Sequence, residues 1–235
     1  MKYSIYKDLA EAACARKKLL SVLIDPDKFE ERSAEKFLLN LPENVTHILV
    51  GGSTVEINKT QTTVEAIKAK TNLPVILFPG DHSQITESAD AILFLSLISG
   101  RNPEFLIEQQ VKSVAQLRNS KLEILPTGYI LIEGGNKSAV QRVSGTKPIP
   151  RTEIETIVNT ALAGQFSGKK LIYLEAGSGA EVSVSEEIIS AVKEAINTPL
   201  IVGGGIRKKQ QLMGAYEAGA DMVVIGTAFE NGMSF

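Results

Sequence analysis

Small residues recur in this sequence directly after short apolar runs, at the places where strands should end. The last two such places are Gly203-Gly204-Gly205 and Gly226-Thr227, which follow the apolar runs at 200–202 and 222–225. Glycine lets backbone N–H groups come close to a ligand, and clustered N–H groups bind anions. The alternative is that these glycines only make tight turns. Because two such turns occur in succession, the sequence favours a phosphate site.

An acid opens a third glycine-rich segment of the same kind. Glu175 follows the apolar run at 170–174 and begins the segment EAGSGA, residues 175–180. A carboxylate at a strand end accepts hydrogen bonds from hydroxyl groups, while neighbouring glycine N–H groups suit a phosphate. The three segments together predict a site for a small phosphate ester that carries hydroxyl groups.

Oxygen ligands for a cation occur at the first two expected strand ends. The first strand must stop at Pro26, because proline cannot continue a ladder, and this leaves Asp25 at its tip. Ser53 follows the second strand in a Gly-Gly-Ser-Thr segment. Since His47 and His82 lie far apart in the sequence, any metal should be a hard cation on oxygen ligands. The alternatives are a turn aspartate at Asp25 and a helix N-cap at Ser53.

These strand ends would form one rim with two halves. The Glu175 segment and the last two glycine turns suit one phosphate ester, while Asp25 and Ser53 can hold Mg²⁺ on a second phosphorylated group. The sequence offers no Ser-His-Asp set, no reactive-cysteine context and no Walker motif. The pattern therefore predicts group transfer between two phosphate-bearing substrates.

Composition narrows the class of protein further. The chain carries 25 basic and 27 acidic side chains. This near-zero net charge does not indicate a nucleic-acid-binding protein. No apolar run reaches the roughly 18 residues of a membrane span, and residues 1–16 contain acids and lack the apolar core of a signal peptide. The single cysteine, Cys14, excludes an internal disulfide and suits a reducing cytosol. We expect a cytoplasmic protein without a transmembrane segment.

The elements that must position these residues alternate between strand and helix patterns. Eight strands alternating with helices are typical of a (β/α)₈ TIM barrel, whose site lies at the carboxyl ends of the strands. The expected strands are 19–24, 46–50, 74–78, 90–97, 122–132 with a break at Thr127-Gly128, 170–174, 200–202 and 222–225. The expected helices are 4–18 before the barrel, 29–41, 62–71, a weak one at 82–89, 104–119, 151–164, 185–195 and 208–218.

The layout of the chain sets two further expectations. No linker divides it, so we expect a single domain over residues 1–235. Because the sequence stops at Phe235, the helix after the eighth strand must be short or incomplete, which makes the barrel a modified one. The alternative fold is a doubly wound open sheet.

The longest expected connection, residues 133–150, is basic, and its apolar residues show no regular helical or strand spacing. It contains Lys137, Arg142 and Lys147, and such a loop near a phosphate cradle would close over a diphosphate. The alternative is ordinary solvated charge. Arg101 would lie at the same rim and could pair with the diphosphate, or it is a surface arginine. His82 is expected in a solvated loop.

Six motifs occur in a fixed order along the chain. They are Asp25-Pro26-Asp27-Lys28, Gly51-Gly52-Ser53, Thr127-Gly128-Tyr129, the run from Tyr173 to Gly179, Gly203-Gly204-Gly205-Ile206-Arg207 and Gly226-Thr227-Ala228. Over nearly the whole chain they resemble the geranylgeranylglyceryl phosphate synthase family, also called the PcrB family. The string YLEAGSG together with GGS and GGGIR is specific, whereas GGG and GTA alone occur in many phosphate-binding barrels. The runs SLISGRNPEFLIEQQV and PTGYILIEGG resemble the branch called group II.

The resemblance implies roles for individual residues. Asp25 and Ser53 match the magnesium positions of the family. The positions that match its sn-glycerol 1-phosphate site are Tyr173, Leu174, Glu175, Ala176, Gly177, Ser178, Gly179, Gly204, Gly205, Gly226 and Thr227. Glu175 would bind the glycerol hydroxyls and accept a proton, and Tyr129 would orient the hydroxyl or stabilise a carbocation with its ring. One branch of the family has lysine where this chain has Leu23, so no phosphate contact is expected there.

The resemblance also implies a reaction and its partners. A Mg²⁺-dependent modified TIM barrel would join sn-glycerol 1-phosphate to an all-trans prenyl diphosphate, form the first ether bond of ether-lipid synthesis and release diphosphate. Group II favours geranylgeranyl over heptaprenyl, is usually homo-oligomeric, and would meet its lipid substrate by peripheral membrane contact. Leu95, Leu97, Ile98 and residues 83–89 are expected to wall the prenyl groove. Two rivals are another phosphate-binding barrel enzyme and a non-catalytic glycerol-phosphate sensor.

Overall fold

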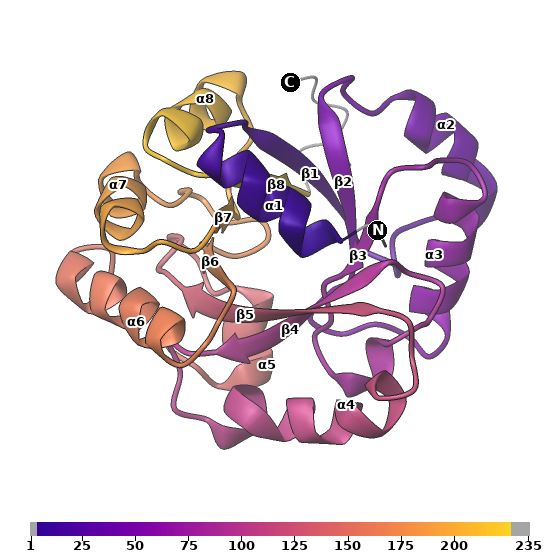
Figure 1. Cartoon of the computed structure of the whole chain (residues 1–235), viewed down its shortest axis with the longest axis horizontal. Coiled ribbons are helices and arrows are strands. Elements are labelled where there is room, and N and C mark those ends of the chain that lie inside the picture. Colours follow the sequence, from indigo (N-terminus) through magenta and orange to yellow (C-terminus); the bar gives the residue numbers. More distant parts are fainter. Residues whose placement is uncertain (1–3, 227–235) are drawn as a thin grey trace.

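Eight parallel strands form a closed barrel in the computed structural model, which describes residues 4–226. Each strand pairs with the next along the chain, and β8 pairs with β1. The strands are β1 (Leu19–Ile24), β2 (Val45–Val50), β3 (Val75–Leu77), β4 (Ala91–Leu97), β5 (Glu123–Leu131), β6 (Leu171–Glu175), β7 (Leu200–Gly203) and β8 (Met222–Ile225) (Figure 1). The predicted (β/α)₈ barrel is confirmed, and the open sheet is wrong. The predicted short helix after β8 lies outside the described residues.

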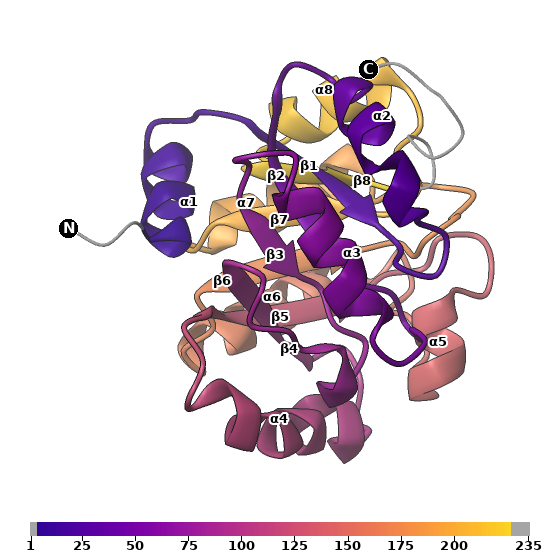
Figure 2. The same ribbon diagram turned by 90° about the vertical axis from the view of Figure 1, so that its right-hand side faces the viewer.

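Helices surround the barrel, and one of them closes its floor. They are α1 (Ile5–Cys14), α2 (Ala34–Leu39), α3 (Lys59–Lys68), α4 (Gln109–Leu117), α5 (Ala139–Ser144), α6 (Ile154–Phe166), α7 (Glu186–Ala195) and α8 (Lys209–Glu217). Short 3₁₀ turns lie at Glu31–Ser33 and His82–Gln84, and a π-helical turn, Glu104–Glu108, precedes α4. Figure 2 shows α1 and α5 at opposite ends of the barrel. Within residues 4–226, none of the helices has the length and apolar character needed to span a bilayer.

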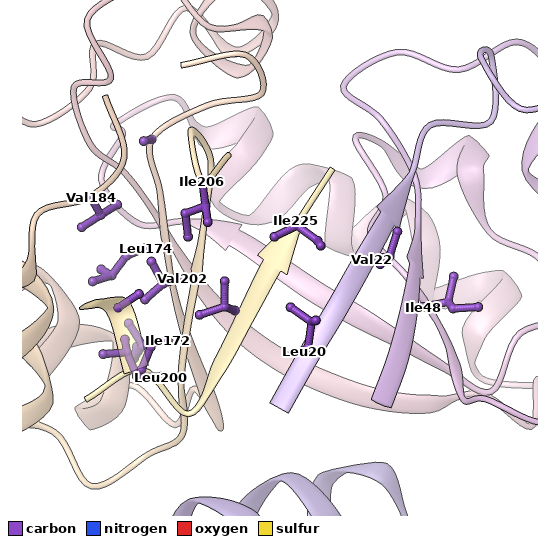
Figure 3. Close-up of a cluster of buried hydrophobic side chains, with 14 of the residues drawn as sticks. Leu20, Val22, Ile48, Ile172, Leu174, Val184, Leu200, Val202, Ile206 and Ile225 are labelled. Atoms are coloured by element: carbon purple, nitrogen blue, oxygen red, sulfur yellow. The ribbon is translucent and has the colours of Figure 1, made fainter. Parts of the chain in front are cut away.

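The core has two layers because the strands are buried on both faces. One layer, which includes Val22, Leu174 and Val202, packs between the strands and the surrounding helices (Figure 3). The other fills the barrel interior with residues such as Leu49 and Leu125. A strand buried on both faces needs a continuous apolar run rather than an alternating one. This is why the strands could be located from the sequence as short apolar stretches.

Helix α1 seals the amino-terminal end of the barrel. Its residues Ile5, Leu9 and Ala12 belong to the interior cluster, whereas Ala15 beyond the helix is exposed. The Glu123 carboxylate at the start of β5 accepts hydrogen bonds from the Ser4 hydroxyl at 2.7 Å and from the N–H groups of Ile5 at 2.6 Å and Tyr6 at 3.0 Å. These bonds satisfy N–H groups that a helix start leaves without partners.

The predicted break inside the fifth strand is wrong, because β5 runs unbroken through Thr127-Gly128. Gly128 lies against α6, where an added Cβ would meet the Cδ1 atoms of Ile98 at 2.8 Å and Ile172 at 3.1 Å. Gly164 of α6 faces the same two side chains. Glycine therefore serves close packing of helix on strand at this position rather than a turn.

Two connections also differ from expectation. The weak helix expected at 82–89 is only the turn His82–Gln84, so the third unit of the barrel lacks a covering helix. The basic connection 133–150, expected to be irregular, contains α5, which begins at an N-cap in which the Ser138 hydroxyl accepts a hydrogen bond from Gln141 N–H. Most helices are shorter than expected; the first after β1 is reduced to Glu31–Ser33 and α2.

Candidate active site

A cavity of about 540 Å³ opens at the carboxyl ends of the strands. Residues from both predicted halves of the rim line it. They are Asp25, Ser53, Tyr129, Tyr173, Glu175, Ser178, Gly179, Gly204, Gly205 and Gly226. The strand ends that lie far apart in the sequence therefore converge on one cavity, which is the usual place of a TIM-barrel active site.

Glu175, the last residue of β6, is a buried acid without a cationic partner among the described residues. Only 5% of its surface is exposed, and its Oε1 accepts a 2.6 Å hydrogen bond from Gly177 N–H. Burial raises the pKa of Glu175 to about 7, and the hydrogen bond from Gly177 opposes that rise. A carboxyl group with a pKa near neutrality can exchange a proton with a substrate hydroxyl.

Two glycines make room for this carboxylate. A Cβ on Gly203 would lie 2.3 Å from the Tyr173 hydroxyl and 3.1 Å from Glu175 Oε2, and a Cβ on Gly204 would lie 2.4 Å from Glu175 Oε1. The Tyr173 hydroxyl lies beside Glu175, and it is buried without a hydrogen bond of ordinary geometry to any described residue. A ligand hydroxyl in the cavity would give this group the partner that a buried polar atom requires.

Three aromatic rings pack together in the cavity wall. The Phe78 ring stacks on Tyr173 with centroids 5.3 Å apart and planes 13° apart, and Tyr129 lies 5.3 Å from Tyr173 and 5.8 Å from Phe78. Burial, reinforced by the Glu175 charge, raises the pKa of the Tyr129 hydroxyl well above its usual value, so this group stays protonated. The rings present an electron-rich surface to the cavity.

The glycine turns form the candidate phosphate cradle. Gly177, Gly179, Gly204 and Gly205 all have left-handed backbones, with φ between 72° and 106°. Such turns bring successive N–H groups toward one ligand. The Leu174 side chain, in contrast, lies in the outer core, so only its backbone can take part in this site. Thr227 lies outside the described residues.

Asp25 and Ser53 follow the neighbouring strands β1 and β2, and both line the cavity. Asp25 Oδ2 lies 3.0 Å from Lys28 Nζ, and a Cβ on Gly52 would lie 3.4 Å from Asp25 Oδ1. Residues 4–226 contain no group of three or more His, Cys, Asp or Glu side chains that could hold a metal. Magnesium usually takes one or two carboxylates together with substrate phosphate oxygens. The pair therefore fits an ion shared with a phosphorylated substrate rather than a closed protein site.

The basic connection lines the cavity only in part. Lys137 and Arg142 belong to the lining, whereas Lys147 does not. The start of this connection is pressed against the β6 turn, because a Cβ on Gly134 would lie 2.2 Å from the Ala176 carbonyl oxygen. Arg101 is also outside the lining, since its guanidinium turns back to the carbonyls of Gly100 and Ile98.

The predicted prenyl wall lines the cavity only in part, and Ile85 is the one residue of 83–89 that does so. Leu95, Leu97 and Ile85 line the cavity, but Ile98 packs between β5 and α6 instead. His82, expected in a solvated loop, is exposed and also belongs to the cavity lining. Its backbone N–H donates to Gln109 Oε1 at 2.8 Å, and its ring Nδ1 lies 2.9 Å from the same oxygen.

Phe78 and Arg207 are two of the lining residues for which the sequence predicted no role. Phe78 follows β3 directly, and only the three-dimensional packing of its ring on Tyr173 marks it. Arg207 follows the Gly203–Gly205 turn, and its position beside an expected phosphate cradle was a signal available in the sequence.

The chain is similar in sequence to known proteins. A sequence model of the PcrB family matches residues 13–234. A geranylgeranylglyceryl phosphate synthase of Zunongwangia profunda is 63% identical over 95% of this chain and 96% of its own length. A protein of the same name from Thermococcus kodakarensis is 46% identical over 92% of this chain and 85% of its own length.

A solved structure resembles the whole chain. It is the crystal structure of (S)-3-O-geranylgeranylglyceryl phosphate synthase from Thermoplasma acidophilum in complex with its substrate sn-glycerol-1-phosphate. The two chains are 36% identical with a TM-score of 0.89, and the match covers 98% of this chain and 93% of that one.

Proposed function

We propose that this chain, which belongs to the PcrB family, transfers a prenyl group from a prenyl diphosphate to sn-glycerol 1-phosphate. The observation that carries the proposal is the cavity in which a buried acid, Glu175, lies between aromatic rings and left-handed glycine turns. The names of the relatives and the substrate bound in the Thermoplasma acidophilum structure support the same reaction.

Glu175 acts as the general base in this proposal. The glycerol hydroxyl oxygen forms a bond to C1 of the prenyl chain, and the bond from C1 to the diphosphate oxygen breaks. Diphosphate leaves with the electron pair, and the hydroxyl proton passes to the Glu175 carboxylate. The pKa of about 7 keeps a large share of Glu175 in the base form at neutral pH while making it a stronger acceptor than an exposed carboxylate.

The aromatic rings stabilise the positive charge that develops at C1. Ring faces attract cations, and more strongly in a site that excludes water. Tyr129 lies against both Phe78 and Tyr173, so its ring or its protonated hydroxyl is held next to the reacting atoms. The apolar side chains beside the rings, including Leu95 and Leu97, provide the wall of a prenyl groove. The resemblance to group II favours the geranylgeranyl chain.

Asp25 and Ser53 would hold Mg²⁺ at the diphosphate side of the cavity. When bound, the ion neutralises charge that accumulates on the leaving diphosphate. Strands β7 and β8 lie between β1, which carries Asp25 at its end, and β6, which carries Glu175, so the proposed diphosphate and glycerol positions are separate parts of one cavity.

The proposal is tested by a product assay. The protein is incubated with Mg²⁺ and geranylgeranyl diphosphate, together with either sn-glycerol 1-phosphate or its sn-3 enantiomer. Prenylglyceryl phosphate formed mainly from the sn-1 compound is the expected result. Binding of sn-glycerol 1-phosphate without product would favour a non-catalytic sensor, and absence of binding would favour another phosphate-binding barrel enzyme.

A further inference from the structure

The phosphate side of the cavity has an unbalanced charge if the proposed function holds. A phosphate monoester is close to a dianion at neutral pH. The glycine turns offer N–H groups with only partial positive charge, and the Glu175 carboxylate in the same half adds negative charge. A cationic side chain on this side would balance the phosphate.

The lining contains four lysine and arginine side chains, and only one comes from the glycine turns. Lys28 pairs with Asp25 on the metal side, at 3.0 Å. Lys137 and Arg142 belong to the basic connection, where Arg142 Nη1 donates to the Lys137 carbonyl at 2.7 Å. Arg207 follows Gly205 by two residues and lies within the β7–α8 turn itself.

A shared carbonyl fixes the Arg207 side chain across the cradle. Arg207 Nη2 donates to the Gly179 carbonyl at 3.1 Å, and Asn136 Nδ2 donates to the same oxygen at 3.0 Å. The Arg207 backbone N–H is bound to Gln211 Oε1 at 2.9 Å. The guanidinium therefore spans from the β7 turn to the β6 turn, next to the left-handed glycines of both.

The guanidinium retains donors for a ligand. Arginine carries five N–H donors, and Gly179 is the one acceptor for the side chain among residues 4–226. Its planar fork suits phosphate oxygens, which accept paired hydrogen bonds.

We propose that Arg207 binds the phosphate of the glycerol phosphate substrate and supplies the positive charge that the glycine cradle lacks. The inference rests on the proposed function for the identity of the ester. The chemistry it requires is that of any phosphate dianion, so inorganic phosphate serves as a second probe.

The test is calorimetric titration of sn-glycerol 1-phosphate and of inorganic phosphate into the protein. For Arg207→Met we expect dissociation constants about tenfold or more higher for both ligands, since a charge-assisted hydrogen bond is lost. Arg207→Lys should recover part of the loss. Arg101→Met is the matched control, because Arg101 also donates to carbonyl groups but lies outside the cavity lining, and it should bind like the wild type.

A pH series separates charge recognition from a purely structural role. Wild-type binding of sn-glycerol 1-phosphate should strengthen as pH rises through about 6, where the dianion of a phosphate monoester forms. Arg207→Met should lose this preference. Weaker binding with an unchanged pH profile would mean that Arg207 only holds the Gly179 turn, and unchanged binding would equally overturn the proposal. Arg207→Gln, which keeps a donor for Gly179 without the charge, replaces the methionine variant if that variant does not fold.

The two probes separate this inference from the proposed function. Wild-type protein that binds inorganic phosphate through Arg207 but neither glycerol phosphate enantiomer would support the arginine and contradict the substrate. Wild-type protein that binds sn-glycerol 1-phosphate as tightly as its Arg207→Met variant would contradict only the arginine. Wild-type protein that binds neither probe would contradict both.

Discussion

The chemistry of Glu175 depends on its burial, because the described residues give it no cationic partner. We expect Glu175→Gln to fold normally and to lower turnover by about 100-fold or more, the loss associated with a missing general base. In the wild type, kcat/KM should rise with pH through about 7, as the Glu175 carboxyl loses its proton. Steady-state rates across this pH range measure both effects.

Glu133→Gln is the matched control for this substitution. Glu133 is exposed and lies outside the cavity lining, so the same loss of one carboxylate there should leave turnover near the wild-type value. A folded Glu175→Gln enzyme with wild-type turnover would remove Glu175 from the mechanism.

Asp25 and Asp27 make a second controlled pair two residues apart. Asp25 lines the cavity, whereas Asp27 Oδ1 accepts a hydrogen bond from Glu56 N–H at 3.0 Å and lies outside the lining. Because Asp25 is the carboxylate we assign to Mg²⁺, Asp25→Asn should need at least about tenfold more Mg²⁺ for half-maximal activity. Asp27→Asn keeps an acceptor for Glu56 and should not change that requirement. Superimposable Mg²⁺ titrations for wild type and Asp25→Asn would exclude Asp25 as a ligand.

The sequence could predict those site residues that are marked by their immediate neighbours along the chain. Asp25, Ser53 and Glu175 could be predicted as lining residues because each lies at or just after the end of an apolar run, and the barrel brings all strand ends to one face. Phe78 was missed because its place in the site is defined by stacking on Tyr173, nearly 100 residues later. Of the two roles left open for Arg101, the structure agrees with a surface arginine, since the side chain is exposed and bonds back to nearby carbonyls.

At the scale of elements, the turn after β7 is fixed by a glycine that no other residue can replace. Gly204 has φ of 83°, and a Cβ there would lie 2.4 Å from Glu175 Oε1 and 2.6 Å from Gly177 N. Gly204→Ala should therefore lower the free energy of unfolding by roughly 1–3 kcal/mol and push the two glycine turns apart. We expect sn-glycerol 1-phosphate to bind about tenfold or more weakly, as measured by calorimetry.

Gly168→Ala separates backbone strain from this steric effect. Gly168 has a similar φ of 86°, and a Cβ there would meet no atom within 4 Å. The variant should lose stability through strain alone, by about 1–2 kcal/mol, and keep wild-type affinity. Equal affinities in Gly204→Ala and Gly168→Ala would show that the β7 turn does not form the cradle.

Strands and most helices were predictable, whereas α5 and the segment 82–89 were not. Burial on both faces gives each strand an uninterrupted apolar run, so the expected and observed strands overlap throughout. Gly128 looked like a break because the sequence does not reveal that α6 approaches it closely. Helix α5 was missed because its stability comes from contacts around the cavity, including the packing of Val140 against the interior cluster, rather than from an apolar period of its own.

At the scale of the whole molecule, two buried titratable groups oppose each other in their effect on stability. His47 lies inside the barrel near α1, and burial lowers its pKa to about 4, with Asp8 opposing that shift. The unfolded chain therefore binds more protons than the folded one between pH 4 and 6.5, so this group makes stability rise with pH. Glu175 has its pKa raised to about 7, so between pH 4.5 and 7 it makes stability fall as pH rises.

Each shift is worth about 3 kcal/mol over its full range, so the two contributions nearly cancel between about pH 4.5 and 6.5. Substitution of either residue should make its own contribution visible as a pH-dependent difference in stability from the wild type. Relative to wild type, Glu175→Gln should gain stability as pH rises from about 4.5 to 7, because a carboxylate that is costly to bury is gone. His47→Gln should gain stability relative to wild type as pH falls from about 6.5 to 4. Urea unfolding at a series of pH values measures these differences, in which all other titrating groups cancel. A difference that does not change with pH, in either variant, would mean that the residue titrates in the folded protein as it does in the unfolded chain.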